Sequence, residues 1–165
     1  MSFELDSKRG VFNHYGQRVT NQKFGGLGSD EVIHFAVWTF DYNDLPTFGT
    51  SNMQYSIPAN ARIVGARLEI ITAFTSTSTT TDLSAGLYTS AGVAISATGL
   101  ITPAQATQTT IATIGNIIDG ASGTPAALIN VTIGAVAGEL VVVGSAADLL
   151  TGRARLIVEY IKAGI

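Results

Sequence analysis

The chain has no cysteine and few charged residues. Without cysteine it has no disulfides, no thiolate chemistry and no zinc site built on cysteine. Charged residues make up 13% of its 165 residues, and only Asp82 and Asp119 are charged between Glu69 and Glu139. The usual charged share is roughly a quarter. Because catalysis needs groups that titrate or attack, this composition argues against an enzyme and favours a surface that packs against other protein.

The basic residues form no dense run, and the net charge is only −3. Nucleic acid is therefore not expected as a partner, since phosphate neutralisation needs clustered lysine and arginine. No apolar run reaches the roughly 18 residues that span a bilayer, so no membrane partner is expected. Residues 1–6 carry acids where a signal peptide needs a basic region. We expect synthesis in the cytoplasm without a standard export signal.

Residues 1–28 differ in composition from residues 29–165. They show no sustained periodicity and end in the glycine-rich stretch 25–28. We expect an extended N-terminal arm over 1–28 and a β-sandwich domain over 29–165. A frayed terminus is the alternative, but disordered tails normally lack aromatic residues. The predicted docking anchors of the arm are its aromatics: Phe3, Phe12, Tyr15 and Phe24.

Residues 31–43 predict a strand with two apolar faces. One face would pack on the core, and the other would be covered by the arm or by a neighbouring subunit. Residues 153–162 predict the last strand, which also places isoleucines on its outer face. We therefore predict that Phe35 and Ile157 lie at an interface with a partner.

Other alternating segments predict further strands at 62–74, 82–89, 127–133 and 139–144. The expected connections are a turn at 55–61, a polar loop at 75–81, a hairpin at 134–138 and a turn at 146–152. A short helix is expected from Pro103, with Thr102 as its N-cap and Ile111, Ile114 and Ile118 at near-helical spacing. Seven or eight strands with at most one short helix indicate an all-β fold, an antiparallel β-sandwich of jelly-roll type.

The candidate chemical sites are few. His14 and His34 lack metal-ligand spacing. The stretch 41–44 lacks the glycine and the distant glutamate of a calcium loop, so its acids are expected to form a turn. Glu69 and Glu159 could serve a glycosidase only across a cleft, and pairing with nearby arginines is the simpler expectation. We predict no catalytic residue, no metal site and no cofactor.

Two segments, SIPANARIVGARLEI at 56–70 and ADLLTGRARLIVEYI at 147–161, resemble stretches common in virion proteins of tailed bacteriophages. The strand at 31–43 fits the same layout, and the resemblance covers residues 31–165. The proteins that these segments resemble are capsid decoration (cement) proteins with jelly-roll sandwiches. The resemblance implies a non-enzymatic structural protein of the virion, made in the host cytoplasm. Its implied partners are further copies of itself, as a dimer or trimer, and the major capsid protein.

Two other functions stay open on the residues alone. A carbohydrate-binding sandwich of a phage tail or fibre would need exposed aromatic platforms, and Tyr42, Tyr55 and Tyr88 lie near predicted loops. Trp38 is a poor platform, because it stands mid-strand between apolar neighbours. A hydrolase on the same scaffold would need a cleft that holds two carboxylates.

Overall fold

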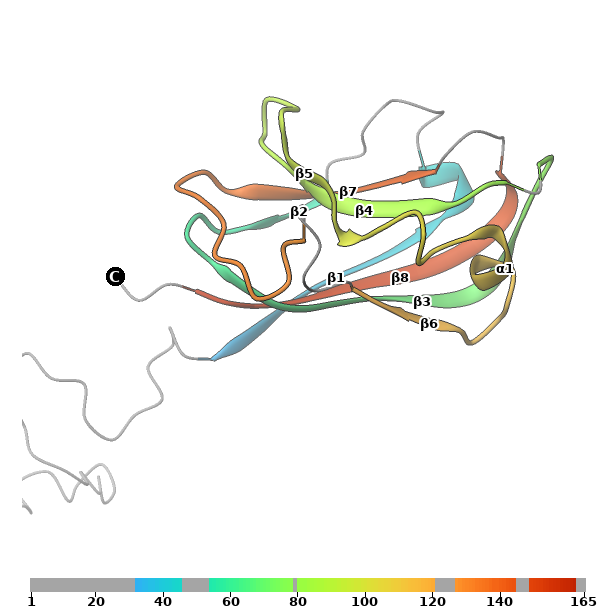
Figure 1. The fold of residues 1–165 in the computed structure, drawn as a ribbon, viewed down its shortest axis with the longest axis horizontal. Coiled ribbons are helices and arrows are strands. Elements are labelled where there is room, and N and C mark those ends of the chain that lie inside the picture. The colour runs from blue at the N-terminus through green and yellow to red at the C-terminus, as the bar shows by residue number, and fades with distance from the viewer. Residues whose placement is uncertain (1–31, 46–53, 79, 121–126, 145–148, 163–165) are drawn as a thin grey trace, which may run out of the picture.

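The computed structural model describes residues 32–45, 54–78, 80–120, 127–144 and 149–162, and the structural statements below concern these residues. Eight strands form two four-stranded antiparallel sheets that pack face to face (Figure 1). The predicted arm, residues 1–28, lies outside the described residues. No helix in the described part is long and apolar enough to cross a membrane.

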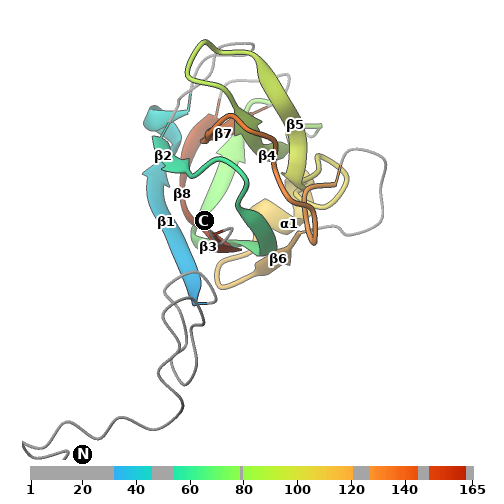
Figure 2. The same ribbon diagram turned by 90° about the vertical axis from the view of Figure 1, so that its left-hand side faces the viewer.

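The first sheet, sheet A, has the order β1-β8-β3-β6, and the second, sheet B, has the order β2-β7-β4-β5. Sheet A comprises β1 (Ile33–Asp41), β8 (Leu149–Ile161), β3 (Arg62–Ser76) and β6 (Ile117–Asp119). Sheet B comprises β2 (Gln54–Ile57), β7 (Gly138–Gly144), β4 (Leu83–Tyr88) and β5 (Ala94–Ile101). Eight antiparallel strands in these two orders make a jelly roll, so the predicted fold class is confirmed. Figure 2 shows β1 and β2 together at one side of the sandwich.

The core lies between the sheets because alternate side chains of the long strands point inward. On β8, Ala154, Leu156 and Val158 are fully buried while the residues between them face out, as the period of a strand requires. On β3, Leu68 and Ile70 are buried in the same way. The strands predicted at 62–74 and 153–162 are confirmed.

An aromatic cluster fills one part of the core. The ring centroids of Trp38 and Phe40 lie 4.9 Å apart, and those of Phe40 and Phe74 lie 6.4 Å apart. All three side chains are buried. Gly152 on β8 lies against the ring of Phe74, which leaves no room for a side chain there. The interpretation of Trp38 as a core residue and not a binding platform is confirmed.

The predicted helix is misplaced. The only α-helix among the described residues is α1 (Gln108–Ile111), which follows Thr107. Residues 102–105 instead form a turn in which the Gln105 N–H donates to the Thr102 carbonyl over 3.0 Å. Gly115, at φ +78°, lies beyond the end of the helix, and Ile118 belongs to β6. The sequence interpretation also missed β5, because its small residues show no clear alternation.

The segment 127–133 is not a strand. The Val131 N–H donates to the Leu128 carbonyl over 3.0 Å, and Asn130 has a φ of +65°, so the chain turns here. Only Thr132 forms an isolated bridge, to Arg62. The hairpin expected at 134–138 is also wrong, because β7 pairs with β2 and β4 of sheet B.

Two of the turns predicted from the sequence are shorter in the structure, because strands occupy part of each. Residues 54–57, expected to belong mostly to a turn, form β2. Strand β8 begins at Leu149, inside the turn expected at 146–152. Strand β3 likewise continues to Ser76, because its last residues pair with the early part of β8. Cross-strand partners extended these strands beyond the point where the hydrophobic alternation ends.

Candidate assembly surface

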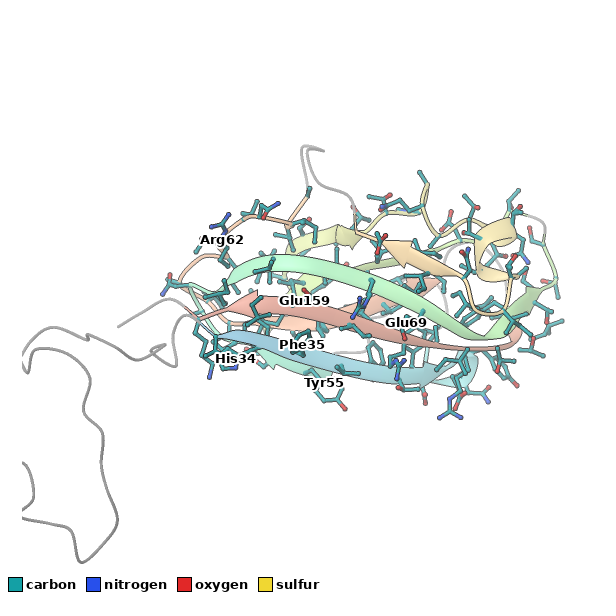
Figure 3. All side chains as sticks on the ribbon, turned by 90° about the horizontal axis from the view of Figure 1, so that it is seen from below. His34, Phe35, Tyr55, Arg62, Glu69 and Glu159 are labelled. Carbon is teal, nitrogen blue, oxygen red and sulfur yellow. The ribbon has the colours of Figure 1, made fainter. Side chains whose placement is uncertain are left out.

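The outer face of sheet A carries a network of oppositely charged side chains (Figure 3). Glu69 on β3 lies directly opposite Arg155 on β8, and the Arg155 Nε donates to Glu69 Oε2 over 2.8 Å. The Arg155 Nη2 donates to the same oxygen. Because the pairing register places the two residues side by side, this ion pair follows from strand alternation and register together.

Neighbouring charged side chains extend this network through ion pairs with longer nitrogen–oxygen distances. Arg67 Nη2 lies 3.8 Å from Glu159 Oε1, and Arg67 Nε lies 3.7 Å from Glu69 Oε1. Arg153 Nε lies 3.7 Å from Asp41 Oδ1, at the end of the sheet. Exposed ion pairs of this kind contribute about 0.2–1 kcal/mol each. The expected pairing of Glu69 and Glu159 with arginines is confirmed.

The strands of sheet A are neutral in sum. Their arginines are Arg62, Arg67, Arg153 and Arg155, and their acids are Asp41, Glu69, Asp119 and Glu159, four of each. A hydrolase needs one carboxyl group that holds a proton and one that stays charged. Here Glu69 and Glu159 are both engaged by arginines of the same sheet face, Arg155 and Arg67. This arrangement fits a structural surface better than a hydrolytic site.

Sheet B differs sharply from sheet A in charge. Glu139 on β7 is the one charged residue within the described strands β2, β7, β4 and β5. Glu139 stands opposite Ser56 on one side and Tyr88 on the other, so it faces no basic partner in the register. The shortage of charge in the sequence therefore maps mainly onto one layer of the sandwich.

An apolar strip lies along β1, the edge strand of sheet A. Its side chains are Ile33, Phe35 and Val37, which are 43%, 58% and 41% exposed. They alternate with the inward-facing Ala36 and Trp38, so both faces of β1 are apolar, as predicted. A large exposed aromatic between two exposed aliphatic residues is a feature of protein contact surfaces.

The two interface residues predicted on strands differ in accessibility. Phe35 is the more exposed, at 58%, and lies opposite Glu159 on β8. Ile157 also faces outward but is only 7% exposed, between Val37 on β1 and Arg67 on β3. Ile157 therefore offers a partner little surface of its own, while it supports Val37 from the side. The four aromatics predicted as arm anchors lie outside the described residues.

Sequence reasoning considered Tyr55 only as a possible sugar-binding platform and did not place it on a strand. This residue lies on β2 at a break in the register between Gln54 and Ser56, with a φ of +52° and 53% of its surface exposed. Figure 3 shows it near the edge of the molecule that also carries Phe35. A β-bulge of this kind aims a side chain away from the sheet. Its only sequence signal was an aromatic residue in a stretch expected to be a turn.

A network of hydroxyl groups connects the end of β3 with the start of β8 and with Thr81. The Thr75 and Thr151 hydroxyls lie 2.7 Å apart, and so do those of Ser76 and Thr81. The Thr151 hydroxyl also donates to the Ala73 carbonyl. The polar loop predicted at 75–81 thus satisfies many of its hydroxyl groups internally and presents no charge.

No group of three or more histidine, cysteine, aspartate or glutamate residues that could hold a metal ion occurs in the part of the chain that the structure describes. The acids at 41–44 instead form a turn. The Asp41 N–H donates to Asp44 Oδ2 over 2.9 Å, and residues 42–44 form a short 3-10 helix. This is the turn-forming role expected of these acids.

Neither a protein-family model nor a curated protein sequence matches the chain. Its fold is similar to that of a chain in the capsid asymmetric unit of cyanophage Pam1, with a TM-score of 0.52 and 18% identity over 95% of this chain and 96% of that one. A chain of the acidic stable capsid structure of Helicobacter pylori bacteriophage KHP30 is also similar, with a TM-score of 0.54 and 14% identity over 81% of this chain and 90% of that one. A chain of the capsid of Ralstonia phage GP4 aligns with a TM-score of 0.49 and 16% identity, covering 80% of this chain and 86% of that one. At these identities, the Pam1 and KHP30 likenesses show a shared fold.

Proposed function

We propose that this chain is a structural component of a bacteriophage capsid and acts as a decoration (cement) protein. In this role it binds the major capsid protein, bridges capsid subunits and catalyses no reaction. The observation that carries the proposal is the end-to-end fold likeness to a chain in the capsid asymmetric unit of cyanophage Pam1, which spans nearly all of both chains. The likeness to a chain of the KHP30 capsid supports the same role.

The surface chemistry is consistent with this role. The charges of sheet A neutralise one another, and the strands of sheet B carry a single charge. Contact surfaces between proteins are depleted in charge at their centres, so such a sandwich loses little solvation energy when a face becomes buried. The rigid jelly roll also pays little conformational entropy on binding, because its strands are already ordered.

Binding would stabilise the shell by mass action. A protein that binds only the assembled shell adds about 2.7 kcal/mol per site when its free concentration is 100 times Kd. We propose that the arm contributes anchors to this contact through Phe3, Phe12, Tyr15 and Phe24. Ordering a side chain costs about 0.5–1.5 kcal/mol. Burying an aromatic at about 25 cal/mol per Å² offsets that cost.

The experiment is a co-sedimentation assay. Purified chain is titrated onto shells assembled from the major capsid protein encoded in the same genome. We expect saturable binding at a fixed ratio to the capsid protein and a rise in the melting temperature of the shells. No co-sedimentation at tens of micromolar chain, with shells that are intact by electron microscopy, would refute the proposal.

A matched pair of variants tests the arm. The first variant replaces the four arm aromatics with alanine, and the control replaces Lys8, Arg18 and Lys23 with alanine. We expect the aromatic variant to bind shells at least about tenfold more weakly, which corresponds to 1.4 kcal/mol. The control should bind within about twofold of the unmodified chain at 150 mM salt, because exposed charges are largely screened there.

The carbohydrate-binding alternative has less support. Among the described tyrosine and tryptophan residues, Trp38 is buried, and only Tyr55 is strongly exposed. Glycan-array binding by a chain that leaves shells unbound would favour this alternative. The array therefore accompanies the co-sedimentation assay.

A further inference from the structure

Three residues other than glycine have a left-handed backbone in the part of the chain that the structure describes. They are Tyr55, Asn60 and Asn130, with φ of +52°, +59° and +65°. Asparagine tolerates this conformation, because its short polar side chain can bond to the nearby backbone. A bulky tyrosine has no such compensation, and its β-carbon crowds the backbone when φ is positive. Tyr55 is therefore the one member of this set whose residue type conflicts with its backbone.

The strain at Tyr55 comes from the way β2 pairs with β7. Gln54 stands opposite Leu140 and Ser56 stands opposite Glu139, so Tyr55 is the extra residue of a β-bulge. Bulges with a left-handed residue favour glycine there, because glycine adopts this conformation without steric cost. A glycine or an asparagine would keep the bulge and relieve the strain. The chain instead carries an aromatic ring where it lowers the stability of the free sandwich.

The ring that this strained backbone carries is exposed. Tyr55 is 53% exposed, and it makes no hydrogen bond or ring contact with the other described residues. Figure 3 shows it at the edge of the molecule. Packing within the described sandwich therefore does not explain the strain. Backbone outliers of this kind cluster at sites that bind or react, and tyrosine is enriched among the residues that dominate protein–protein binding.

We infer that Tyr55 is an anchor through which the chain binds the capsid shell, and that the bulge aims its ring at the shell protein. The inference rests on the proposed function, which names the shell as the partner. Strand β2 is an edge of sheet B, the layer whose strands carry only Glu139 as a charge. Tyr55 thus stands at the border of the face whose desolvation costs least. Because a tyrosine has only two rotatable side-chain bonds, its ring adds contact area at a low cost in entropy.

Thermal unfolding of the full chain tests the strain. Tyr55→Asn and Tyr55→Ala both remove the ring, but only asparagine tolerates the left-handed backbone. We expect Tyr55→Asn to melt at least about 2 °C above Tyr55→Ala, and no lower than the unmodified chain. A smaller difference between the two variants would overturn the inference. Melting of Tyr55→Asn clearly below the unmodified chain would do so too, because it would show that the ring packs against its own chain.

Co-sedimentation with shells of the major capsid protein tests the partner. Tyr55→Asn and Tyr55→Ala should both bind shells at least about tenfold more weakly than the unmodified chain. Tyr55→Phe should bind within about threefold of it, because the ring supplies most of the contact area. The matched control is Ile71→Thr on β3 of sheet A, which changes a residue that is 43% exposed. This control should bind within about twofold of the unmodified chain.

Two further measurements distinguish the shell from other partners of the ring. In sedimentation equilibrium without shells, Tyr55→Ala should self-associate as the unmodified chain does. Self-association weakened about tenfold or more would assign Tyr55 to a contact between copies and overturn the inference. Glycan-array binding that Tyr55→Ala abolishes would assign the ring to a carbohydrate and overturn it as well.

The results separate this inference from the proposed function. If the unmodified chain leaves intact shells unbound, both are refuted. If the unmodified chain binds shells and Tyr55→Asn and Tyr55→Ala bind them equally well, the proposed function stands and only the anchor role of Tyr55 is refuted. Weaker shell binding by a Tyr55→Asn chain that is at least as stable as the unmodified one supports both.

Discussion

Substitution of Gly152 by alanine should destabilise the sandwich strongly. Gly152 has a φ of +135°, a conformation that side chains rarely adopt, and such strain costs of order 1–3 kcal/mol. A β-carbon there would also stand 2.1 Å from Cδ1 of Phe74, inside the aromatic core cluster. Forcing a methyl group into a packed core typically costs about 1–3 kcal/mol. The two contributions together predict a loss of roughly 2–6 kcal/mol in the free energy of unfolding.

A double-mutant cycle separates the two causes. Phe74→Leu removes part of the ring and should cost about 1–2 kcal/mol by itself. If the steric clash dominates, Gly152→Ala combined with Phe74→Leu will lose less than the sum of the single losses, by about 1 kcal/mol or more. If backbone strain dominates, the two losses will add within about 0.5 kcal/mol.

Urea unfolding followed by tryptophan fluorescence is the assay. Trp38 is the single tryptophan and is buried beside Phe40, so its emission reports on this part of the core. Gly134→Ala is the matched control, because a β-carbon there would contact nothing within 4 Å. If Gly152→Ala and Gly134→Ala unfold within about 0.5 kcal/mol of each other, the packing described around Gly152 is wrong.

Three further substitutions test other parts of the fold. Gly86→Ala places a β-carbon 2.1 Å from the Ser96 carbonyl oxygen, so it should push β4 from β5 and cost about 1–3 kcal/mol in urea unfolding. Leu156→Ala empties a fully buried position and should cost about 2–5 kcal/mol by the same measurement. Glu69→Gln removes the charge beside Arg155 and should cost only about 0.2–1 kcal/mol. That last loss should shrink between 0.05 and 1 M salt, and a loss that is independent of salt would contradict the ion pair.

The parts of the fold that could be predicted are those where burial alternates strictly. The interior sides of β8, β4 and the first half of β3 follow directly from alternation of apolar and polar residues. Strand β5 was missed because its first residues are small and partly exposed, and its register shifts against β4 break the period. Alternation at 127–133 was misleading, since the left-handed Asn130 turns the chain there.

The candidate surface was predictable only in part, for a similar reason. Alternation places Phe35 and Ile157 on outer faces, and both do point outward. Whether such a residue is accessible depends on the strands beside it, and those neighbours follow from the sheet order. Phe35 lies on an edge strand with one neighbour, whereas Ile157 lies between Val37 and Arg67, which cover it. Sheet order arises from contacts distant in sequence, which local periodicity does not encode.

The distribution of charge ties the fold to the proposed role. Every arginine among the described residues lies in sheet A, where acids of equal number stand beside them, while the strands of sheet B contain one charge. A protein that works alone in water is helped by charge spread over all its faces. Here most charges of sheet A stand beside an opposite charge, and its exposed apolar residues lie on β1 and at Ile71, Leu150 and Ile117. Sheet B keeps a face whose desolvation costs little. Such a division suits the proposed role, in which the subunit meets a shell across a broad, weakly charged face.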